Sequence, residues 1–408
     1  MNSEMMKRAA ETYGTPLYVF EEDRFADHYL ELDGAYKSVY PKFQIAYSFK
    51  TNYMPAVCRR VLTLGGWAEV VSDMEYHLAK RYGFPPERII VNGPGKWNGM
   101  EEMILDGAFL MLDNRFEYER SAAIARKNNL TAKIGFRLNM DIGTNKNSRF
   151  GFDVTDPETE ALIRAAREDG HMEIIGLHFH LGGARNLQAW QTRAEKMLHY
   201  AGTLLEDSER TIIDLGSGMF GHMHPAFAQQ FHQQIPSFRE YAQTVAGLFA
   251  QAYGSLPEEK RPTLIVEPGT TVVADTMVYA VSVIATKCVR GRNIAMVDGS
   301  VHQLGELGKK KRLPVEVLYR EAQTKRLPLA DITGYTCLED DILYPGLEQP
   351  VGQGDLLWFQ NAGAYTNVMK PPFIQVGCKI VSCRNDGTMS LVKREETTED
   401  ILASYIID

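Results

Sequence analysis

One lysine stands where a buried reactive amine would be expected. Lys50 lies in the stretch Tyr47-Ser48-Phe49-Lys50-Thr51-Asn52, directly after an apolar run, residues 43–47, that predicts a strand. A lysine in a low-dielectric site loses its proton more easily, and the neutral amine can form a Schiff base with an aldehyde cofactor. The alternative is an ordinary surface lysine at the end of a strand, and the local sequence leaves both readings open.

Two histidines end another strand-like run, His178-Phe179-His180-Leu181-Gly182-Gly183. Because side chains alternate along a strand, we expect both imidazoles on the same face. One of them could stack on a flat cofactor ring, or both could be hydrogen-bonded histidines of the core. A histidine pair could also bind zinc, but no Asp or Glu stands nearby at ligand spacing, so we expect no metal.

Two further strand ends carry residues suited to a charged ligand. Gly216-Ser217-Gly218 could bring backbone amides close to an anion, and the N-terminus of a following helix would add its dipole. In Glu267-Pro268-Gly269, a buried carboxylate would need a partner, and a pyridine nitrogen held protonated by Glu267 is one. The alternative is a turn with a solvent-facing glutamate.

The elements that must hold these residues alternate in type. The predicted strands are residues 16–20, 43–49, 67–71, 88–91, 109–112, 133–138, 173–180, 211–215 and 263–267. Segments with helical spacing lie between them, and Ser72 is expected to cap the helix 73–82. Roughly eight strand–helix units in about 250 residues match a (β/α)8 TIM barrel. In such a barrel the chemistry lies at the C-terminal strand ends, where Ser72, Asn92 and Arg137 also stand.

The pattern changes at about Thr271. Residues 271–287, 293–297, 315–319, 356–359, 374–382 and 390–394 predict strands separated by glycine-containing turns. We therefore expect an α/β protein with a second, all-β domain, a Greek-key-like barrel. The barrel is predicted to span residues 24–268, and residues 1–23 and 269–408 are predicted to form the β-domain.

Composition excludes several classes of protein. The chain has 408 residues and a net charge of −8, which argues against nucleic-acid binding. Its five cysteines match no zinc pattern and favour a reduced, cytoplasmic protein. We see no apolar signal core at the N-terminus and no run long enough to span a bilayer, so no membrane association is expected.

Six motifs in this order resemble one family. They are Tyr47 to Asn52, His178 to Gly183, Gly216-Ser217-Gly218, Glu267-Pro268-Gly269, Cys337-Leu338-Glu339-Asp340-Asp341 and Asn361-Ala362-Gly363-Ala364-Tyr365. Together they resemble the pyridoxal-phosphate decarboxylases of the alanine-racemase-like fold, which include diaminopimelate and ornithine/arginine decarboxylases. The resemblance runs from about Thr15 to the C-terminus and implies pyridoxal 5'-phosphate as cofactor and an amino acid as substrate.

The resemblance implies a role for each matching residue. Lys50 matches the lysine that forms the imine with the cofactor, His180 the histidine that stacks on its ring, and Glu267 the carboxylate that pairs with its pyridine nitrogen. The positions that match phosphate-binding residues are Gly216, Ser217, Gly218, Gly269 and Tyr365. Cys337 matches the cysteine that reaches the site from a second subunit and helps protonate the product carbanion, so a homodimer with shared active sites is implied.

The chain also departs from the family, which puts the substrate in doubt. Thr270, which we include among the cofactor-binding positions, stands where the family often has an arginine that contacts phosphate or substrate. Arg149 stands where the family often has a lysine before Phe-Gly, and we predict that it contacts substrate. Glu339, Asp340 and Asp341 could receive a distal ammonium group or form a solvated acidic loop.

Several substrates and two other functions stay open. The substrate could resemble diaminopimelate, ornithine or lysine, or could be a carrier-bound amino acid of a secondary-metabolite pathway, as the turn 92–96 suggests. A racemase on the same fold would need a second base and usually pairs the pyridine nitrogen with arginine, which Glu267 and Cys337 argue against. A non-catalytic regulator would not need Lys50, His180, Glu267 and Cys337 together.

Overall fold

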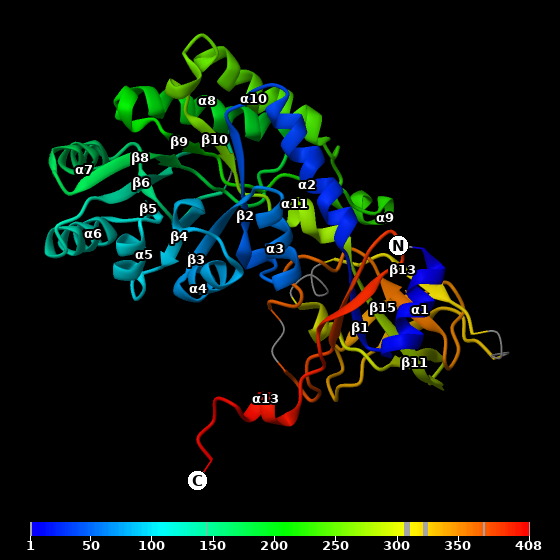
Figure 1. The fold of residues 1–408 in the computed structure, drawn as a ribbon. Coiled ribbons are helices and arrows are strands. Elements are labelled where there is room, and N and C mark those ends of the chain that lie inside the picture. The colour runs from blue at the N-terminus through cyan, green and yellow to red at the C-terminus, as the bar shows by residue number, and fades with distance from the viewer. Residues whose placement is uncertain (1, 145, 306–310, 321–324, 370–371, 408) are drawn as a thin grey trace. The chain divides into compact units, whose positions relative to one another are not determined.

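The computed structural model describes residues 2–144, 146–305, 311–320, 325–369 and 372–407 (Figure 1). The chain divides into two compact units. The first, here called the sheet domain, comprises Met1–Ala26, His222–Gln233 and Val272–Asp408. The second, here called the barrel domain, comprises Asp27–Gly221 and Gln234–Thr271.

Eight parallel strands close the barrel domain. They are β2 (Phe43–Ser48), β3 (Trp67–Ser72), β4 (Ile89–Gly95), β5 (Phe109–Leu112), β6 (Ala132–Asn139), β8 (Met172–His178), β9 (Ile212–Asp214) and β10 (Thr263–Val266). Each strand pairs with the next, and β10 pairs with β2 to close the ring, with Leu264 opposite Phe43. The short β7 (Phe152–Asp153) pairs only with the end of β6. The predicted (β/α)8 barrel is therefore confirmed.

Helices surround the barrel strands (Figure 1). They are α2 (Glu22–Lys37), α3 (Pro55–Thr63), α4 (Asp73–Tyr82), α5 (Met100–Asp106), α6 (Arg115–Lys127), α7 (Pro157–Glu168), α8 (Leu187–Leu204) and α10 (Phe238–Tyr253). Ser72 accepts a hydrogen bond from the Glu75 amide, which confirms the predicted cap of α4. The amphipathic helices bury one face each, as Tyr29, Leu32 and Tyr36 of α2 show.

The sheet domain is a mixed sheet. Its strands are β1 (Leu17–Glu21), β11 (Met277–Val289), β12 (Arg292–Val297), β13 (Val315–Leu318), β14 (Ala330–Thr333), β15 (Ile342–Leu347), β16 (Leu356–Phe359), β17 (Lys379–Cys383) and β18 (Met389–Lys393). They follow the order β15-β14-β12-β11-β1-β17-β18, and β16 pairs with β11 and β13. The N-terminal β1 runs antiparallel to β11 and parallel to β17, so both ends of the sequence share one sheet.

Short helices complete the described structure. The remaining α-helices are α1 (Ser3–Tyr13), α9 (Pro225–Ala228), α11 (Thr270–Val273) and α13 (Thr398–Leu402). The 3₁₀ turns are Phe49–Thr51, Pro86–Arg88, Asp207–Glu209, Gln229–Phe231, Glu258–Lys260, Ala274–Thr276 and Val301–Leu304. None of the described helices is long and apolar enough to cross a membrane.

One predicted strand begins later than expected. Residues 270–276 are helical, in α11 and the following 3₁₀ turn, and β11 begins only at Met277. The β-branched run Thr270-Thr271-Val272-Val273 favours a strand, but the preference is weak and tertiary contacts override it. Thr271 Oγ1 donates to the Met219 carbonyl (3.1 Å) and Thr276 Oγ1 to the Val273 carbonyl (2.8 Å), which stabilises the turns.

Candidate active site

Lys50 is paired with a buried carboxylate. It lies in the 3₁₀ turn that follows β2, and its Nζ donates to Glu69 Oε2 over 2.5 Å. The Lys50 side chain is 32% exposed and the Glu69 side chain 1%, so the ion pair is open on the lysine side only. Ser48 Oγ donates to the same carboxylate oxygen (2.6 Å). The lysine is therefore held at the strand end with about a third of its side chain exposed, a position from which its amine could form a covalent bond to a cofactor.

Glu267 lies in a second buried group of polar side chains. It follows β10 and is 3% exposed. His178 Nε2 lies 3.3 Å from its Oε1, and Asn92 Nδ2 donates a short hydrogen bond to the same oxygen. Asn92 also donates to Glu69 Oε1 (3.3 Å), so one amide links the two carboxylates. The alternative of a solvent-facing Glu267 is therefore excluded.

The pKa values of Glu267 and its neighbour Asp214 move in opposite directions. Burial raises the pKa of Asp214 well above its ordinary value, and the charge of Glu267 raises it further. Burial alone would also raise the pKa of Glu267, but His178, Lys50 and His180 outweigh it and the pKa falls below its ordinary value. The proton of this carboxyl pair therefore belongs on Asp214, and Glu267 stays ionised.

Carboxyl groups do lie close to a histidine, contrary to the sequence expectation. The candidate ligand atoms of His178, Asp214 and Glu267 lie within 4.8 Å of one another. These residues come from the ends of β8, β9 and β10, which are neighbours in the barrel but far apart in the sequence. The expectation that no Asp or Glu stands near the histidines was wrong, because sequence spacing does not show which strands are adjacent.

His180 is tied to the glycine-containing turn. Its Nδ1 accepts a hydrogen bond from the Ser217 amide (3.1 Å), so that nitrogen carries no proton. Burial lowers the pKa of His180 well below its ordinary value, which agrees with a neutral ring. A Cβ on Gly216 would lie 2.7 Å from His180 Cβ, and Gly216 has a φ of +60°, so only glycine fits there.

The helix expected after this turn does not follow it. In the described part of the chain, the next helix is α9, which begins at Pro225 and belongs to the sheet domain. The turn therefore lacks the predicted helix dipole.

Gly269 brings the Glu-Pro-Gly turn against the lysine segment. A Cβ at this position would lie 2.0 Å from Thr51 Oγ1. The Ser48 amide also donates to the Pro268 carbonyl (3.2 Å). The segments that carry Lys50 and Glu267 are therefore packed backbone to backbone. Thr270 begins α11 directly after this contact.

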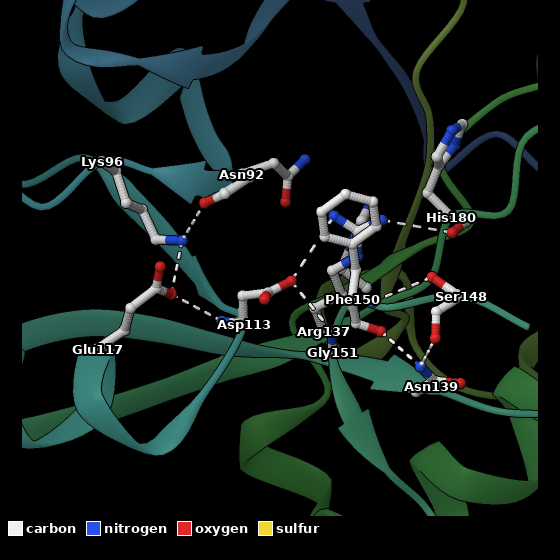
Figure 2. Close-up of polar contacts among 12 residues, drawn as sticks. Asn92, Lys96, Asp113, Glu117, Arg137, Asn139, Ser148, Phe150, Gly151 and His180 are labelled. Carbon is white, nitrogen blue, oxygen red and sulfur yellow. Dashed lines mark hydrogen bonds and ion pairs between the residues drawn. The ribbon is translucent and has the colours of Figure 1, made fainter.

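A chain of interacting charged residues, shown in Figure 2, extends from the site to Lys96, which follows β4. Lys96 Nζ lies 2.6 Å from Glu117 Oε2, and both side chains are almost fully buried. Glu117 accepts from the Asp113 amide (2.7 Å), and Asp113 Oδ1 lies 3.8 Å from Arg137 Nη1. Arg137 Nη2 in turn donates to the His180 carbonyl (3.4 Å). The interaction chain thus reaches the backbone of a predicted cofactor-binding residue.

Arg149 lies at the surface of the same region. Its guanidinium stacks 4.1 Å from the centroid of the Phe150 ring, and Arg137 lies 4.6 Å from the same ring. Asn139 Nδ2 donates to the carbonyls of Ser148 and Phe150, both at 2.8 Å, and holds this loop to the end of β6 (Figure 2). Arg149 is exposed, as a substrate contact would require.

The remaining predicted residues belong to the sheet domain. Cys337, Glu339 and Asp340 are exposed, and the Cys337 thiol is free. Asp341 is buried and accepts hydrogen bonds from the Ser300 hydroxyl, the Val301 amide and both polar groups of Thr336. The hydrogen-bond donors of the Asp341 carboxylate therefore come from the sheet domain itself. Tyr365 is partly buried and has a φ of +56°.

Four polar residues of the site were not identified as such from the sequence. Glu69 and Glu117 stand in no motif, whereas Asp214 opens the glycine-containing motif and Lys96 ends the turn 92–96, but neither was given a role. Glu69 and Asp214 interrupt otherwise apolar strands, which was an available signal.

Comparison with known proteins covers nearly the whole chain. Residues 31–274 match the pyridoxal binding domain of the pyridoxal-dependent decarboxylases, and residues 270–363 match their C-terminal sheet domain. A diaminopimelate decarboxylase of Aquifex aeolicus is 25% identical over 411 residues, covering 97% of this chain and 93% of that protein. The L-glutamyl-[BtrI acyl-carrier protein] decarboxylase of Niallia circulans is 27% identical over 418 residues, covering 97% and 94%.

A solved structure shows the same fold. The crystal structure of diaminopimelate decarboxylase from M. jannaschii matches with a TM-score of 0.83 and 23% sequence identity, covering 98% of this chain and 94% of that one.

The residues of the barrel domain fit pyridoxal phosphate. The cofactor needs an amine for its aldehyde carbon, an anion for its pyridine nitrogen and a narrow backbone cradle for its phosphate. Lys50 and the ionised Glu267 fit the first two needs, and the glycine-containing turn that packs against His180 fits the third. The chain belongs to the pyridoxal-dependent decarboxylases, and it is an amino acid decarboxylase, a carboxy-lyase that uses pyridoxal phosphate.

Proposed function

We propose that Lys50 holds the cofactor aldehyde, Glu267 its pyridine nitrogen and His180 one face of its ring. Gly216, Ser217, Gly218 and Gly269, with Thr270 and Tyr365, are the proposed phosphate-binding positions. The observation that carries the proposal is the ionised, buried Glu267, which is linked through Asn92 to the carboxylate that pairs with Lys50. A buried carboxylate that stays ionised is suited to a protonated pyridine nitrogen.

The residues then have distinct tasks. The bound cofactor withdraws electrons from the substrate's α-carbon as CO2 leaves. Glu267 keeps a fixed negative charge at the pyridine nitrogen, and Asp214 holds the competing proton, so the two buried carboxyls do not repel each other. Glu69 Oε2, 2.5 Å from Lys50 Nζ, can take a proton from this amine when it must be neutral.

Protonation of the α-carbon is assigned to Cys337, with Lys50 as the other candidate donor. The exposed, free thiol of Cys337 supports this role, because a donor must reach a substrate bound outside its own domain. We propose that Cys337 completes the site of a partner subunit, so the enzyme is a homodimer. Its free cysteines support a reducing, cytoplasmic location.

The proposed substrate is an α-amino acid with a distal ammonium group, like diaminopimelate, lysine or ornithine. Glu339 and Asp340 are exposed and can receive such a group, whereas Asp341 is occupied within its own domain. Arg149 is available for a substrate carboxylate. A carrier-bound amino acid, the substrate form named for the relative from Niallia circulans, is the competing form.

A substrate panel tests this proposal. CO2 release should be measured with meso-diaminopimelate, L- and D-lysine, L- and D-ornithine, and L-glutamate both free and thioester-linked to a carrier protein. The proposal predicts turnover of a diamino acid and loss of its selectivity in the double variant Glu339→Gln and Asp340→Asn. Turnover of the carrier-linked substrate alone would overturn the assignment of the distal group.

Mixed dimers test the shared site. Lys50→Ala and Cys337→Ala are each expected to lose most activity, but in a mixed dimer one site keeps both native residues. Equal mixing after dissociation should restore about a quarter of the wild-type activity, because about half of the dimers are mixed and each has one intact site. No recovery in dimers that have exchanged subunits would contradict the shared site.

A further inference from the structure

Arg193 is a buried arginine that contacts two of the predicted cofactor-binding segments. It lies in α8 and is fully buried. Its Nη1 donates to the carbonyls of Leu215 (3.0 Å) and Ser217 (2.9 Å), and its Nη2 donates to the carbonyl of Leu181 (3.1 Å). One guanidinium thus fastens the glycine-containing turn and the segment after His180 to the same helix.

The charge of Arg193 has no direct counter-ion among the described residues. No carboxylate there lies within the 4.0 Å of an ion pair; the guanidinium instead stacks 4.3 Å from the Trp190 ring and 5.4 Å from the Phe179 ring. Burial lowers the pKa of Arg193 to about 10, so it remains charged at neutral pH. The charge of Glu267 acts on Arg193 only from beyond ion-pair distance, so a buried cation bonded to carbonyls and stacked on rings would gain from an anion bound at the turn.

The hydrogen bonds of Arg193 fix the direction of the turn's amides. In a trans peptide the C=O and N–H point in opposite directions. Because the Ser217 carbonyl faces Arg193, the Gly218 N–H faces away from it. The Gly216 amide is already bonded to Asp214 Oδ1 (2.8 Å) and the Ser217 amide to His180 Nδ1. Within the described part of the chain, no protein acceptor bonds to the Gly218 N–H, which leaves it for a ligand.

We propose that Arg193 is the positioning residue that makes the turn 216–218 an anion site. It holds the Ser217 carbonyl, so that the Gly218 amide of the same peptide points toward the phosphate. Its positive charge also takes the place of the helix N-terminus that the turn lacks. Oriented peptides transmit that charge to the ligand in the way that backbone nests bind anions. This inference rests on the proposed function, in which the turn binds the cofactor phosphate.

The test compares pyridoxal phosphate with pyridoxal, which lacks the phosphate. The cofactor is removed from the full-length enzyme, and both compounds are titrated into the wild type and into Arg193→Met by fluorescence or absorbance. The dissociation constant of pyridoxal divided by that of pyridoxal phosphate gives the contribution of the phosphate to binding, and this quotient is called the ratio below. Arg193→Met is expected to reduce this ratio about tenfold, the effect of one charge-assisted hydrogen bond. Inorganic phosphate should also raise the Tm of the wild-type apoenzyme but not of the variant.

Arg167→Gln is the matched control. Arg167 also lies in a barrel-domain helix and also donates to a backbone carbonyl, that of Leu204 (2.9 Å), but its partners are remote from the turn. It pairs with Glu209 at 2.7 Å, so its loss should lower stability without changing the ratio. A general loss of stability would lower the Tm of both variants, whereas a loss of phosphate positioning would lower the ratio only in Arg193→Met.

The outcomes separate this inference from the proposed function. A wild-type ratio in Arg193→Met would overturn the inference and leave the cofactor assignment intact. If Arg193→Met does not fold, Arg193→Lys decides, because lysine keeps the charge but cannot bridge three carbonyls. A loss of about threefold or more in its ratio supports the inference, and an unchanged ratio overturns it. A wild-type enzyme that binds both compounds equally would instead refute the phosphate role of the turn itself.

Discussion

Lys50 Nζ lies 2.5 Å from Glu69 Oε2, in an ion pair whose lysine is 32% exposed and whose glutamate is buried. The carboxylate is fixed by Ser48 and Asn92 as well, so it cannot follow the lysine when the amine moves to another partner. The pair therefore places the Lys50 amine against a proton acceptor that three donors hold. Asn92 donates to this carboxylate and to Glu267, so hydrogen bonds link the two proposed ends of the cofactor site.

Glu267→Gln should lower kcat by about 10²-fold, because the amide has the same shape but no charge for the pyridine nitrogen. Since the pKa of Glu267 lies below its ordinary value, its protonation should not limit activity between pH 5 and 8. The matched variant is Asp214→Asn, which removes the neighbouring carboxyl that is already protonated. Steady-state CO2 release should show a far smaller loss for Asp214→Asn, and equal losses would contradict the assigned charges.

Glu75 should make stability depend on pH. Burial, with the nearby charge of Glu69, raises the pKa of Glu75 to about 7. The folded state then binds more protons than the unfolded state between about pH 4.5 and 7. The contribution of protonated Glu75 to the free energy of unfolding is therefore present at low pH and is lost as the pH rises through 7. In urea unfolding of the apoenzyme at pH 5, 6, 7 and 8, the free energy of unfolding should fall by about 2 kcal/mol across this range, and Glu75→Gln should abolish the fall. An identical decline in the variant would exclude Glu75 as its cause.

Single substitutions in the buried Lys96–Glu117 pair should destabilise the protein strongly. Removal of one partner leaves an unpaired buried charge, so Lys96→Met and Glu117→Gln should each lower the free energy of unfolding by about 3 kcal/mol. The double variant should cost clearly less than the sum of the two, which a double-mutant cycle in urea measures. Because the pair connects through Asp113 and Arg137 to the His180 carbonyl, the single variants should also bind the cofactor more weakly. Additive losses would show that the two charges are independent.

The sequence predicted the residues at the strand ends better than their partners. Lys50, His180 and Glu267 stand in motifs, and the barrel rule places all three at the same end of parallel strands. Glu69 stands in no motif and Asp214 was given no role in its motif, because their partners come from adjacent strands whose register a sequence does not contain. Lys96 and Arg193 were missed for a related reason, since burial of a charge depends on tertiary packing.

Adjacent residues can also differ in ways that the sequence does not show. Glu339, Asp340 and Asp341 form one acidic run, yet the first two are exposed and the third is buried with its carboxylate occupied. Likewise, the β-branched residues 270–273 favour a strand, but form a helical turn because Gly269 packs against Thr51 and Thr271 bonds to Met219. In both cases long-range contacts decided the outcome.

The central claim is that Lys50 holds the cofactor and makes decarboxylation possible. It is tested most directly by purifying Lys50→Ala and Lys42→Ala and measuring the visible absorbance of the lysine-bound cofactor together with CO2 release. Lys42 precedes β2, at the opposite end of the strand that leads to Lys50, and serves as the matched control. We predict that Lys50→Ala loses both signals and that Lys42→Ala keeps them. Wild-type absorbance and CO2 release in Lys50→Ala would contradict the account.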